Sequence, residues 1–535
     1  MLATAARRCT PTAGCIGRAR RAWSVPKTNA VVPARAPVGR GYATSAGGQA
    51  PAAPAAAVGS LAPIVSELDR MAPSFDVRQE SIRILKTPAE FYETLKDRIR
   101  HAKRRIFLST LYIGKSEQEL IETLRDALRR NPRLRLSVLT DALRGTREAP
   151  EPSCASLLAP LVTEFGPDRV EIRMYHTPNL TGLRKRYIPK RINEGWGLQH
   201  MKLYGVDDEI ILSGANLSTD YFTNRQDRYH LFACENITDY FSKIHDGVSS
   251  FSFLVQPSAE NDAGFTLSWP SSNSAPSPLA EPAAFVRSTT SLLRTLISPP
   301  DTPAPGPLTD TRVYVLGQMS QLLRPDSSTE LPVVTCILQR LAEPAYRGSS
   351  WTFTAGYFNP AASLTRLLLE TASARGTVIT AAPEANGFYQ SRGVSGLLPD
   401  AYVLLARRFL DCVRGAGRGA DITLKEWRRG TAGQPAGWTY HAKGLWVTLP
   451  GDAHPALSLI GSSNYTQRSY SLDLEVGALI VTRGRDLRAR LADEQRWLQD
   501  HARAVTRDDF ARNDRRVGLK VRVAMWIVRL VGGAL

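Results

Sequence analysis

The chain has 535 residues, of which 43% are hydrophobic and 22% charged, a composition that excludes a largely disordered protein. One hydrophobic core rarely organises a chain of this length, so we expect two domains of ordinary size together with tails. The formal net charge of +18 favours an anionic partner, and nucleic acid, acidic membrane lipid and phosphorylated substrates all fit it.

The six cysteines occur without Cys-x-x-Cys or Cys/His ligand spacing, so the sequence predicts neither a zinc site nor a disulfide framework. We therefore expect no metal and no cofactor. No run of about 18 apolar residues occurs, so a membrane-spanning helix is not expected either.

Residues 1–45 have the composition of a mitochondrial transit peptide. They carry arginines and a lysine among Ala, Ser and Thr, and the first acidic residue of the chain is Glu67. The stretch from Arg40 to Ala43 resembles a mitochondrial processing site, with cleavage after Tyr42. A disordered basic arm is the alternative interpretation. A linker rich in Ala, Pro and Gly is expected to follow over residues 46–71.

The first domain is predicted over residues 72–254, where strand and helix patterns alternate as in α/β layers. Residues 105–112 (RIFLSTLY) form an apolar strand, and residues 116–130 show helical spacing after Ser116, a candidate N-cap. Residues 134–140 (LRLSVLT) then alternate like a strand.

The second domain is predicted over residues 311–510, because the same scheme returns there. Residues 351–357 form a strand, residues 360–374 a helix and residues 377–381 another strand. Between the domains, residues 255–310 are rich in Ser, Pro, Asn and Ala, and we interpret them as the inter-domain connection. The sequence therefore indicates an internal duplication.

A His-x-Lys pair at His200 and Lys202 is the most informative feature of the first half. Asp207 follows it, and a Ser-Gly-Ala-Asn turn then ends at Asn216. Alternate side chains of a strand point to the same face, so an imidazole and an ammonium can converge on one anionic group.

The second half repeats this order with His441 and Lys443, followed by a Gly-Ser-Ser-Asn turn that ends at Asn464. Thr448 stands where the repeat would place a counterpart of Asp207, which leaves a structural role open for that aspartate. A single His-x-Lys pair is usually a solvated strand face. Two copies with the same downstream turn indicate a functional site instead.

An acidic residue follows each asparagine at the same distance along the chain, Asp227 after Asn216 and Glu475 after Asn464. A carboxylate placed to accept the Nδ1 proton of each histidine would fix its tautomer. The Nε2 atom would then be free for chemistry.

This paired pattern resembles the phospholipase D superfamily. Within it, the closer resemblance is to the eukaryotic mitochondrial family of CDP-diacylglycerol–glycerol-3-phosphate 3-phosphatidyltransferases, and it spans about residues 72–510. The segments that carry it are GLQHMK (197–202), SGANLS (213–218), YFTNRQDRY (221–229), PEANGFY (383–389) and YHAKGLW (440–446). The resemblance implies an α/β fold of two phospholipase D-like repeats, packed as a pseudo-symmetric pair with the active site at their interface.

The activity that the resemblance implies is transfer of a phosphatidyl group from CDP-diacylglycerol to glycerol 3-phosphate. The products would be CMP and phosphatidylglycerophosphate, for phosphatidylglycerol and cardiolipin synthesis. We expect His200 to be the nucleophile that forms a phosphohistidine, because its motif is complete, and His441 to be the general acid. Asp207 completes the catalytic set.

The remaining residues of the predicted site hold phosphate groups. Lys202 and Lys443, helped by Asn216 and Asn464, are expected to bind the nonbridging oxygens and stabilise the developing charge. The acceptor carries its own phosphate, so a basic patch is also expected, and its candidates are Arg191, Arg225 and Arg228. A solvated or lipid-facing basic loop is the alternative for each arginine. Residues 383–389 are a candidate lining of the nucleotide pocket.

The C-terminal segment, residues 511–535, interleaves Val, Leu, Ile, Met and Trp with Arg and Lys. This pattern suits a segment that lies in an anionic lipid surface, and a terminal helix docked on the protein's own core is the alternative. Together with the transit peptide, it predicts a mitochondrial protein peripheral on the inner membrane.

Other functions share parts of this pattern. Cardiolipin synthases and lipid hydrolases of the phospholipase D type carry the same motif pair and differ in the acceptor. Phospholipase D folds also cleave DNA or RNA, but no nucleic-acid motif is present, so we expect no nucleic-acid partner. A catalytically dead homologue would need a broken motif, and only Thr448 points that way. The oligomeric state stays open.

Overall fold

A computed structural model of the protein describes residues 59–190, 192–299 and 310–530. These residues belong to a compact unit that begins at Ala56. The predicted transit peptide and the first part of the predicted linker, as far as residue 58, lie outside the described residues, as does Arg191.

The first half of the chain builds a mixed nine-stranded sheet. Its strands are β2 Ile82–Leu85, β3 Arg105–Ser109, β4 Arg135–Asp141, β5 Val170–Tyr175, β6 Leu203–Val206, β7 Glu209–Ser213, β9 Tyr229–Ala233, β10 Phe253–Pro257 and β11 Phe265–Ser268. They lie in the order β11-β10-β5-β4-β3-β6-β7-β9-β2. The strands β3, β4 and β5 run parallel, and every other neighbouring pair is antiparallel.

The second sheet also has nine strands. They are β1 Ser74–Val77, β12 Thr311–Gln318, β13 Ser350–Ala355, β14 Arg375–Ala381, β15 Ile422–Trp427, β17 Lys443–Thr448, β18 Leu457–Gly461, β19 Glu475–Thr482 and β20 Ala502–Ala504. Their order is β1-β12-β19-β18-β17-β13-β14-β15-β20. The run β15-β14-β13-β17-β18-β19 therefore has the same order and directions as β5-β4-β3-β6-β7-β9 in the first sheet.

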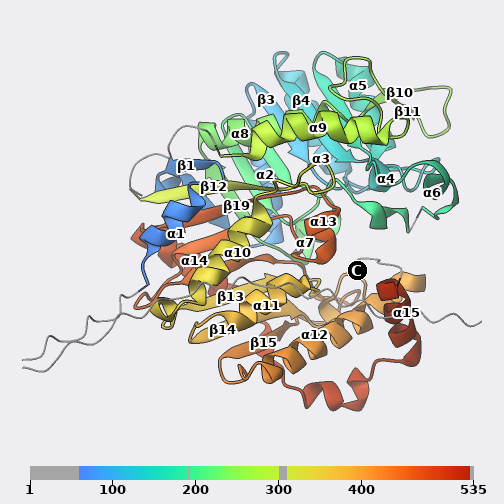
Figure 1. The fold of residues 1–535 in the computed structure, drawn as a ribbon. Coiled ribbons are helices and arrows are strands. Elements are labelled where there is room, and N and C mark those ends of the chain that lie inside the picture. The colour runs from blue at the N-terminus through green and yellow to red at the C-terminus, as the bar shows by residue number, and fades with distance from the viewer. Residues whose placement is uncertain (1–58, 191, 300–309, 531–535) are drawn as a thin grey trace, which may run out of the picture. The chain divides into compact units, whose positions relative to one another are not determined.

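Helices cover the two sheets (Figure 1). The α-helices are α1 Leu61–Leu68, α2 Pro88–Arg100, α3 Gln118–Arg130, α4 Ala142–Gly145, α5 Cys154–Phe165, α6 Gly182–Tyr187, α7 Thr219–Thr223, α8 Glu235–Ser249, α9 Pro282–Ile297, α10 Glu330–Leu341, α11 Ala362–Glu370, α12 Leu398–Gly415, α13 Gln467–Ser471, α14 Arg485–Trp497 and α15 Leu519–Leu530. Short 3₁₀ turns include η2 Asn193–Trp196, η4 Pro383–Ala385 and η5 Gly393–Leu397.

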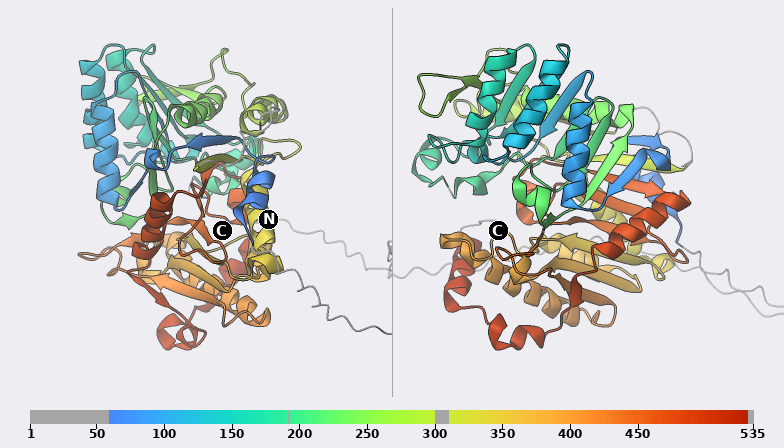
Figure 2. Two further views of the ribbon diagram at one scale, coloured as in Figure 1. Left: turned by 90° about the vertical axis from the view of Figure 1, so that its left-hand side faces the viewer. Right: turned by 180° about the vertical axis from the view of Figure 1, so that it is seen from behind.

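Three large hydrophobic clusters organise these layers. One lies between the first sheet and α2, α3 and α5, and another between the second sheet and α1, α10, α11 and α12. The third contains side chains of both sheets together with α8, α9 and α14. Because this third cluster draws on both halves, the sheets share a core (Figure 2).

The predicted strands and helices of both halves are present, with shifted ends. The strand predicted over 105–112 ends at Ser109, where the chain leaves the sheet. The helix predicted from Ser116 begins at Gln118 after Glu117, and no side chain caps it. The carboxylate of Glu117 instead accepts hydrogen bonds from the backbone and hydroxyl of Thr219, both at 2.7 Å. Ser116 is therefore not the N-cap.

The segment predicted as the inter-domain connection, residues 255–310, contributes to the first half. Its start completes β10, and β11 pairs with β10 at the edge of the first sheet. The helix α9 buries Phe285, Leu293 and Ile297 in the core that the sheets share. Residues 300–309 lie outside the described residues.

Part of the predicted linker is ordered as well. The helix α1 buries Ile64 and Leu68 against the second half, and β1 joins the second sheet beside β12. At the other end of the chain, α15 packs on α12 through Val521 and Met525. No helix of the described residues combines the length and apolar character that crossing a membrane requires.

Candidate functional site

Both His-x-Lys pairs lie where a strand begins, next to the first parallel strand of each sheet, β3 or β13. His200 and Lys202 immediately precede β6, and Lys443 is the first residue of β17, two positions after His441. All four side chains are buried, and both lysines are only 1% exposed. An ammonium is costly to bury without a charged partner. Lys443 has such a partner in Asp227, whereas Lys202 makes no ion pair with the described residues, so Lys202 indicates a site for an anionic group.

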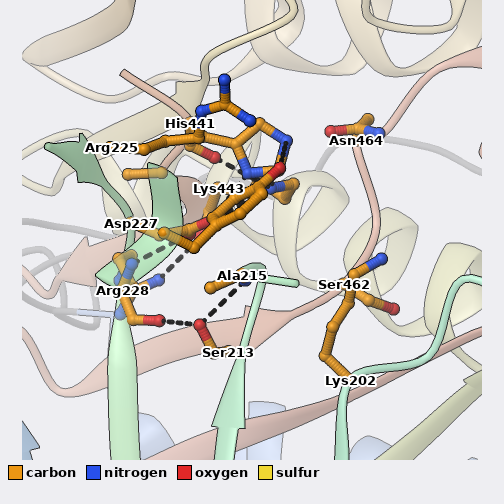
Figure 3. Close-up of polar contacts among 12 residues, drawn as sticks. Lys202, Ser213, Ala215, Arg225, Asp227, Arg228, His441, Lys443, Ser462 and Asn464 are labelled. Carbon is orange, nitrogen blue, oxygen red and sulfur yellow. Dashed lines mark hydrogen bonds and ion pairs between the residues drawn. The ribbon is translucent and has the colours of Figure 1, made fainter. Parts of the chain in front are cut away.

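His441 is held by a carboxylate from the other half of the chain. Its Nδ1 lies 2.7 Å from Oδ2 of Asp227, and the Nζ of Lys443 lies 3.3 Å from the same oxygen. Figure 3 shows Asp227 linked on one side to His441 and Lys443 and on the other to Arg228. With Nδ1 donating to Asp227, Nε2 of His441 faces the hydroxyl of Tyr221 at 3.4 Å.

His200 is held in the same way by the second half. Its Nδ1 lies 2.9 Å from Oε2 of Glu475, and Ser462 donates a 2.5 Å hydrogen bond to that oxygen. The Nε2 of His200 makes no hydrogen bond with any described residue, so it is available as a nucleophile.

Backbone hydrogen bonds also join the two halves beside these side-chain contacts. The amide of His441 donates to the carbonyl of Gln226, next to Asp227, and the amide of His200 donates to the carbonyl of Leu474, next to Glu475. Each histidine is therefore aligned by the strand that carries its carboxylate. The acids predicted to orient the histidines do so, but each acts on the histidine of the opposite half.

The small-residue turns let these groups approach one another. A Cβ at Gly214 would lie 2.5 Å from Nζ of Lys443 and 2.8 Å from the carboxylate oxygens of Asp227. In the second half Ser462 occupies the matching position and uses its hydroxyl to orient Glu475. The residue at this turn position therefore depends on how closely the charged groups beside it approach.

Electrostatics make the two halves of the site unequal. Burial raises the pKa of Glu475 to about 7, although Lys202 and Ser462 oppose this shift. Burial also disfavours the ionised form of Asp227, but Lys443 and His441 outweigh it and lower the pKa of Asp227. His441 therefore has an ionised partner, Asp227, at neutral pH. The partner of His200, Glu475, titrates near neutral pH instead.

The pKa values of the lysine and histidine side chains of the site are lowered. Burial lowers the pKa of Lys202 to about 7, and it lowers the pKa of both His200 and His441 well below the usual range. The charge of Lys443 adds to the lowering for Lys202 and His200. Both histidines are therefore neutral near pH 7, and the two motifs act on one electrostatic cluster.

The asparagines of the two turns differ in burial, because Asn216 is buried and Asn464 is half-buried. The Nδ2 of Asn216 lies 3.4 Å from the hydroxyl of Tyr221, which also contacts His441. The Oδ1 atoms of Asn216 and Asn464 have no hydrogen-bond partner among the described residues. Buried amide oxygens without a hydrogen-bond partner are unusual in a protein core and are typical of a binding site.

Arg225 is the predicted basic residue that reaches this cluster. Its guanidinium lies over the ring of Tyr221, contacts Asp220 at 3.0 Å and Thr439 at 3.0 Å, and contributes to the lowered pKa of His441. Its Nη1 makes no hydrogen bond with the described residues. Arg225 can therefore still bind an anionic group next to His441.

Arg228 does not reach the site, which corrects the sequence prediction. Its five N–H groups donate to Glu494, Ser458 and the carbonyls of Lys443 and Leu459, so no donor is left for a substrate. Its role is to join the two halves beneath the site.

Asp207 is the second correction. It lies at the far end of β6 with a positive φ of 51°, and its carboxylate accepts the backbone amides of Lys103, Arg104 and Arg105. Asp207 therefore stabilises a turn away from the histidines and takes no catalytic role. Arg191 lies outside the described residues.

Three tyrosines near His441 were missed by the sequence predictions. The rings of Tyr221 and Tyr357 meet the imidazole edge to face at 5.2 and 5.1 Å, and Tyr402 stacks on Tyr357. Tyr221 lies inside a segment that carried the family resemblance, which was the available signal for it. Phe388, from the predicted nucleotide-pocket segment, lies 5.3 Å from Tyr357. Among the described residues, no group of His, Cys, Asp and Glu is arranged to hold a metal ion.

The chain is similar to known proteins over most of its length. It is 44% identical over 466 residues to the CDP-diacylglycerol–glycerol-3-phosphate 3-phosphatidyltransferase of Saccharomyces cerevisiae, covering 85% of this chain and 88% of the relative. The mitochondrial enzymes of that name from mouse and human are 36% and 35% identical, each over 86% of this chain and over 85% and 84% of the relative. No protein-family model matches the chain.

Among solved structures, the phosphatidylserine synthase of Haemophilus influenzae is similar in fold. The match has a TM-score of 0.67 and 20% identity, and it covers 89% of this chain and 98% of that one. The sequence relatives carry more information, because their identities of 35–44% are higher than the 20% of the structural match. The protein is a transferase and belongs to the family of CDP-diacylglycerol–glycerol-3-phosphate 3-phosphatidyltransferases.

Proposed function

We propose that the protein transfers a phosphatidyl group from CDP-diacylglycerol to glycerol 3-phosphate through a phosphohistidine, in an active site at the interface of two pseudo-symmetric phospholipase D-like domains. The observation that carries this proposal is the exchange of carboxylates, with Glu475 on His200 and Asp227 on His441. The domains would span residues 72–254 and 311–510, although β1 and α9 extend their contacts beyond a simple division.

In the first step, Nε2 of His200 attacks the phosphorus that carries diacylglycerol. The bond from this phosphorus to the bridging oxygen breaks, and CMP leaves with the Nε2 proton of His441, which His441 takes from solvent when the anionic substrate binds beside it. Lys202 and Lys443 neutralise the nonbridging oxygens, so the negative charge of the substrate no longer repels the nucleophile.

In the second step, His441 takes the proton of a glycerol 3-phosphate hydroxyl. That oxygen attacks the phosphatidyl group on His200, the P–N bond breaks, and phosphatidylglycerophosphate leaves. The ionised Asp227 stabilises the imidazolium form of His441 in both steps. Arg225 is the candidate contact for the phosphate of the acceptor.

A requirement for the acceptor tests this function. Purified protein mixed with CDP-diacylglycerol in detergent micelles should release at most one CMP per enzyme molecule at first, and it should release CMP continuously only when glycerol 3-phosphate is added. His200→Ala should release none under either condition. Equal CMP release without the acceptor would indicate a lipid hydrolase and overturn the transferase mechanism.

The pH dependence follows from Glu475 and Lys202. In the free enzyme kcat/KM should rise through about pH 7, as Glu475 ionises and accepts the Nδ1 proton of His200, and fall above it, as Lys202 loses its charge. Glu475→Gln should remove the acidic limb and lower kcat/KM at its optimum by about 10²-fold or more. Lys202→Arg should remove the alkaline limb, because guanidinium stays charged.

Full pH profiles of the three proteins measure both limbs separately. An unchanged acidic limb in Glu475→Gln would mean that another group controls the rate, and this would contradict the assigned orientation of His200.

The proposed location is the mitochondrial inner membrane, where the enzyme would be peripheral and its product would supply phosphatidylglycerol and cardiolipin synthesis. The mammalian relatives are labelled mitochondrial, which supports the organelle. The substrate is a lipid, so the protein must meet a membrane surface, and no nucleic-acid partner is proposed.

A further inference from the structure

Exposed apolar side chains are concentrated in three short segments. Among the described residues, the large hydrophobic side chains that stand exposed are Leu183, Tyr187, Ile192, Val394, Leu519, Val523 and Trp526. The first three lie in or just after α6, Val394 lies in η5, and the last three lie on α15. A soluble surface does not favour such grouping, which is typical of a contact with a partner or a membrane.

These segments lie on one side of the compact unit. In Figure 1 α6 and α15 are both at the right, and in the rear view of Figure 2 both are at the left. The turn η5 packs on α12, and so does α15 through Val521 and Met525, so two of the three segments share one support. The other, α6, has no buried side chain of its own.

None of the three segments contains an acid, and two of them, α6 and α15, are basic. Neither residues 181–192 nor the chain after Asp514 contains an Asp or a Glu, whereas α6 carries Arg184, Lys185 and Arg186. Apolar residues interleaved with cations match the two parts of an anionic lipid surface, its acyl boundary and its phosphates.

A cavity of about 380 Å³ lies between α12 and α15, at the base of the exposed face of α15. Four arginines line it, Arg407, Arg515, Arg516 and Arg522. The apolar part of its wall includes Leu404, Val517 and Leu519. The cavity therefore combines guanidinium groups with an apolar wall that continues to the exposed Leu519.

Arg407, Arg516 and Arg522 differ from the fourth arginine, Arg515. Arg515 also lines the cavity, but it is neutralised by a two-point ion pair with Glu426. The guanidinium groups of Arg407, Arg516 and Arg522 have no hydrogen-bond or ion-pair partner within the described part of the chain. Their charge is therefore available to an external anion.

We propose that α6, η5 and α15 form a docking surface for an anionic phospholipid bilayer, and that the arginine cavity between α12 and α15 binds the phosphate of one of its lipids. This inference deepens the proposed peripheral membrane location and rests on it. Leu183, Tyr187, Val523 and Trp526 enter the acyl boundary, while the cations of α6 and α15 remain among the phosphates.

Vesicle co-sedimentation of the full chain tests the apolar contacts. Wild-type protein should bind equimolar phosphatidylcholine–phosphatidylglycerol vesicles and bind phosphatidylcholine vesicles much more weakly. Leu183→Ala/Tyr187→Ala and Val523→Ala/Trp526→Ala should each weaken binding to the anionic vesicles by about tenfold. Wild-type binding by both variants would overturn the docking surface.

A second pair of variants tests the cavity. Arg407→Gln/Arg522→Gln should weaken binding by roughly tenfold or more, whereas Arg287→Gln/Arg366→Gln, an equal charge change at exposed arginines of α9 and α11, should not. An equal loss of vesicle binding in both pairs would show that only net charge matters, and it would overturn the proposed binding of a lipid phosphate in the cavity. Inorganic phosphate should displace the protein no more than chloride of equal ionic strength, and a larger effect would make the cavity a free-phosphate site.

CMP release in detergent micelles separates docking from catalysis. All four variants should keep the wild-type rate there, because none of the changed residues contacts the histidines. Failure of the vesicle experiment with normal micellar activity would overturn the docking surface alone, and loss of micellar activity in wild type would overturn the proposed reaction alone.

Discussion

Replacement of His200 by alanine should lower the rate of phosphatidyl transfer by about three orders of magnitude or more. The expected loss is large because His200 offers the unpaired Nε2 of the site, and Glu475 holds its ring in the tautomer that exposes this atom. His441→Ala should cause a comparable loss by removing the proton donor of the first step. Initial rates of CMP release at saturating glycerol 3-phosphate measure both effects.

His101→Ala is the matched control, because the side chain of His101 is 75% exposed and lies outside the site. It should retain the wild-type rate. Circular dichroism and thermal unfolding should show that His200→Ala keeps the native fold. A folded His200→Ala protein within tenfold of the wild-type rate would refute the nucleophile assignment.

Replacement of Glu494 by glutamine should lower the free energy of unfolding by about 3–5 kcal/mol. Glu494 is 1% exposed and receives hydrogen bonds from Arg228 at 2.8 and 3.0 Å, from His230 at 2.9 Å and from Trp446 at 3.1 Å. The substitution leaves the buried guanidinium of Arg228 uncompensated. Because Arg228 and Glu494 come from opposite halves, the loss should appear as a lower urea midpoint of the whole unit.

The pH dependence of this pair has a defined sign. Burial raises the pKa of Glu494, but Arg228 and His230 outweigh it and lower the pKa to about 2. A depressed pKa contributes stability that is fully present above the ordinary value of 4.5 and is lost as pH falls through 2. Wild type should therefore lose this contribution on acidification, and Glu494→Gln should not show it.

The apolar double variant Arg228→Met/Glu494→Leu is the control for this prediction. It removes both charges, so it should be less destabilised than the sum of the two single substitutions. Additive effects, or a Glu494→Gln protein as stable as wild type, would show that the pair does not hold the halves together.

Local pattern predicted much of the fold and named most of the residues of the candidate site. The parallel strands β3, β4, β13 and β14 were foreseeable because their apolar runs are short and repeat in the same order. The segment before β12 was not, because its Ser- and Pro-rich loops hide the helix α9, whose buried residues Phe285, Leu293 and Ile297 are spaced by a turn or more. The average composition of the segment does not show such a helix, because only one face of the helix carries the buried apolar residues.

The pairing of acid with histidine could not be predicted, because it is a property of how the halves meet. The equal spacing from Asn216 to Asp227 and from Asn464 to Glu475 predicted one acid for each histidine, but it did not say which acid serves which histidine. The contacts cross between halves, since strand-end backbone bonds join Gln226 to His441 and Leu474 to His200.

Arg228 illustrates how a single step along an extended chain changes a residue's role. Arg225 and Asp227 are two positions apart and both face His441, whereas Arg228 points to the opposite side and contacts α14. Its basic character and its place in a family-like segment suggested a substrate contact. The alternation of side chains was the signal that could have corrected this.

Trapping the covalent intermediate tests the central claim most directly. The full chain is mixed with CDP-diacylglycerol labelled in the phosphatidyl phosphate, without glycerol 3-phosphate, and the reaction is stopped with denaturant under non-acidic conditions. Wild type should carry labelled phosphatidyl on the protein at once, His441→Ala should acquire it more slowly because its first step lacks the proton donor, and His200→Ala should carry none. Label on His200→Ala but not on His441→Ala would contradict the assigned roles, and an active wild-type enzyme without any label would contradict the phosphohistidine itself.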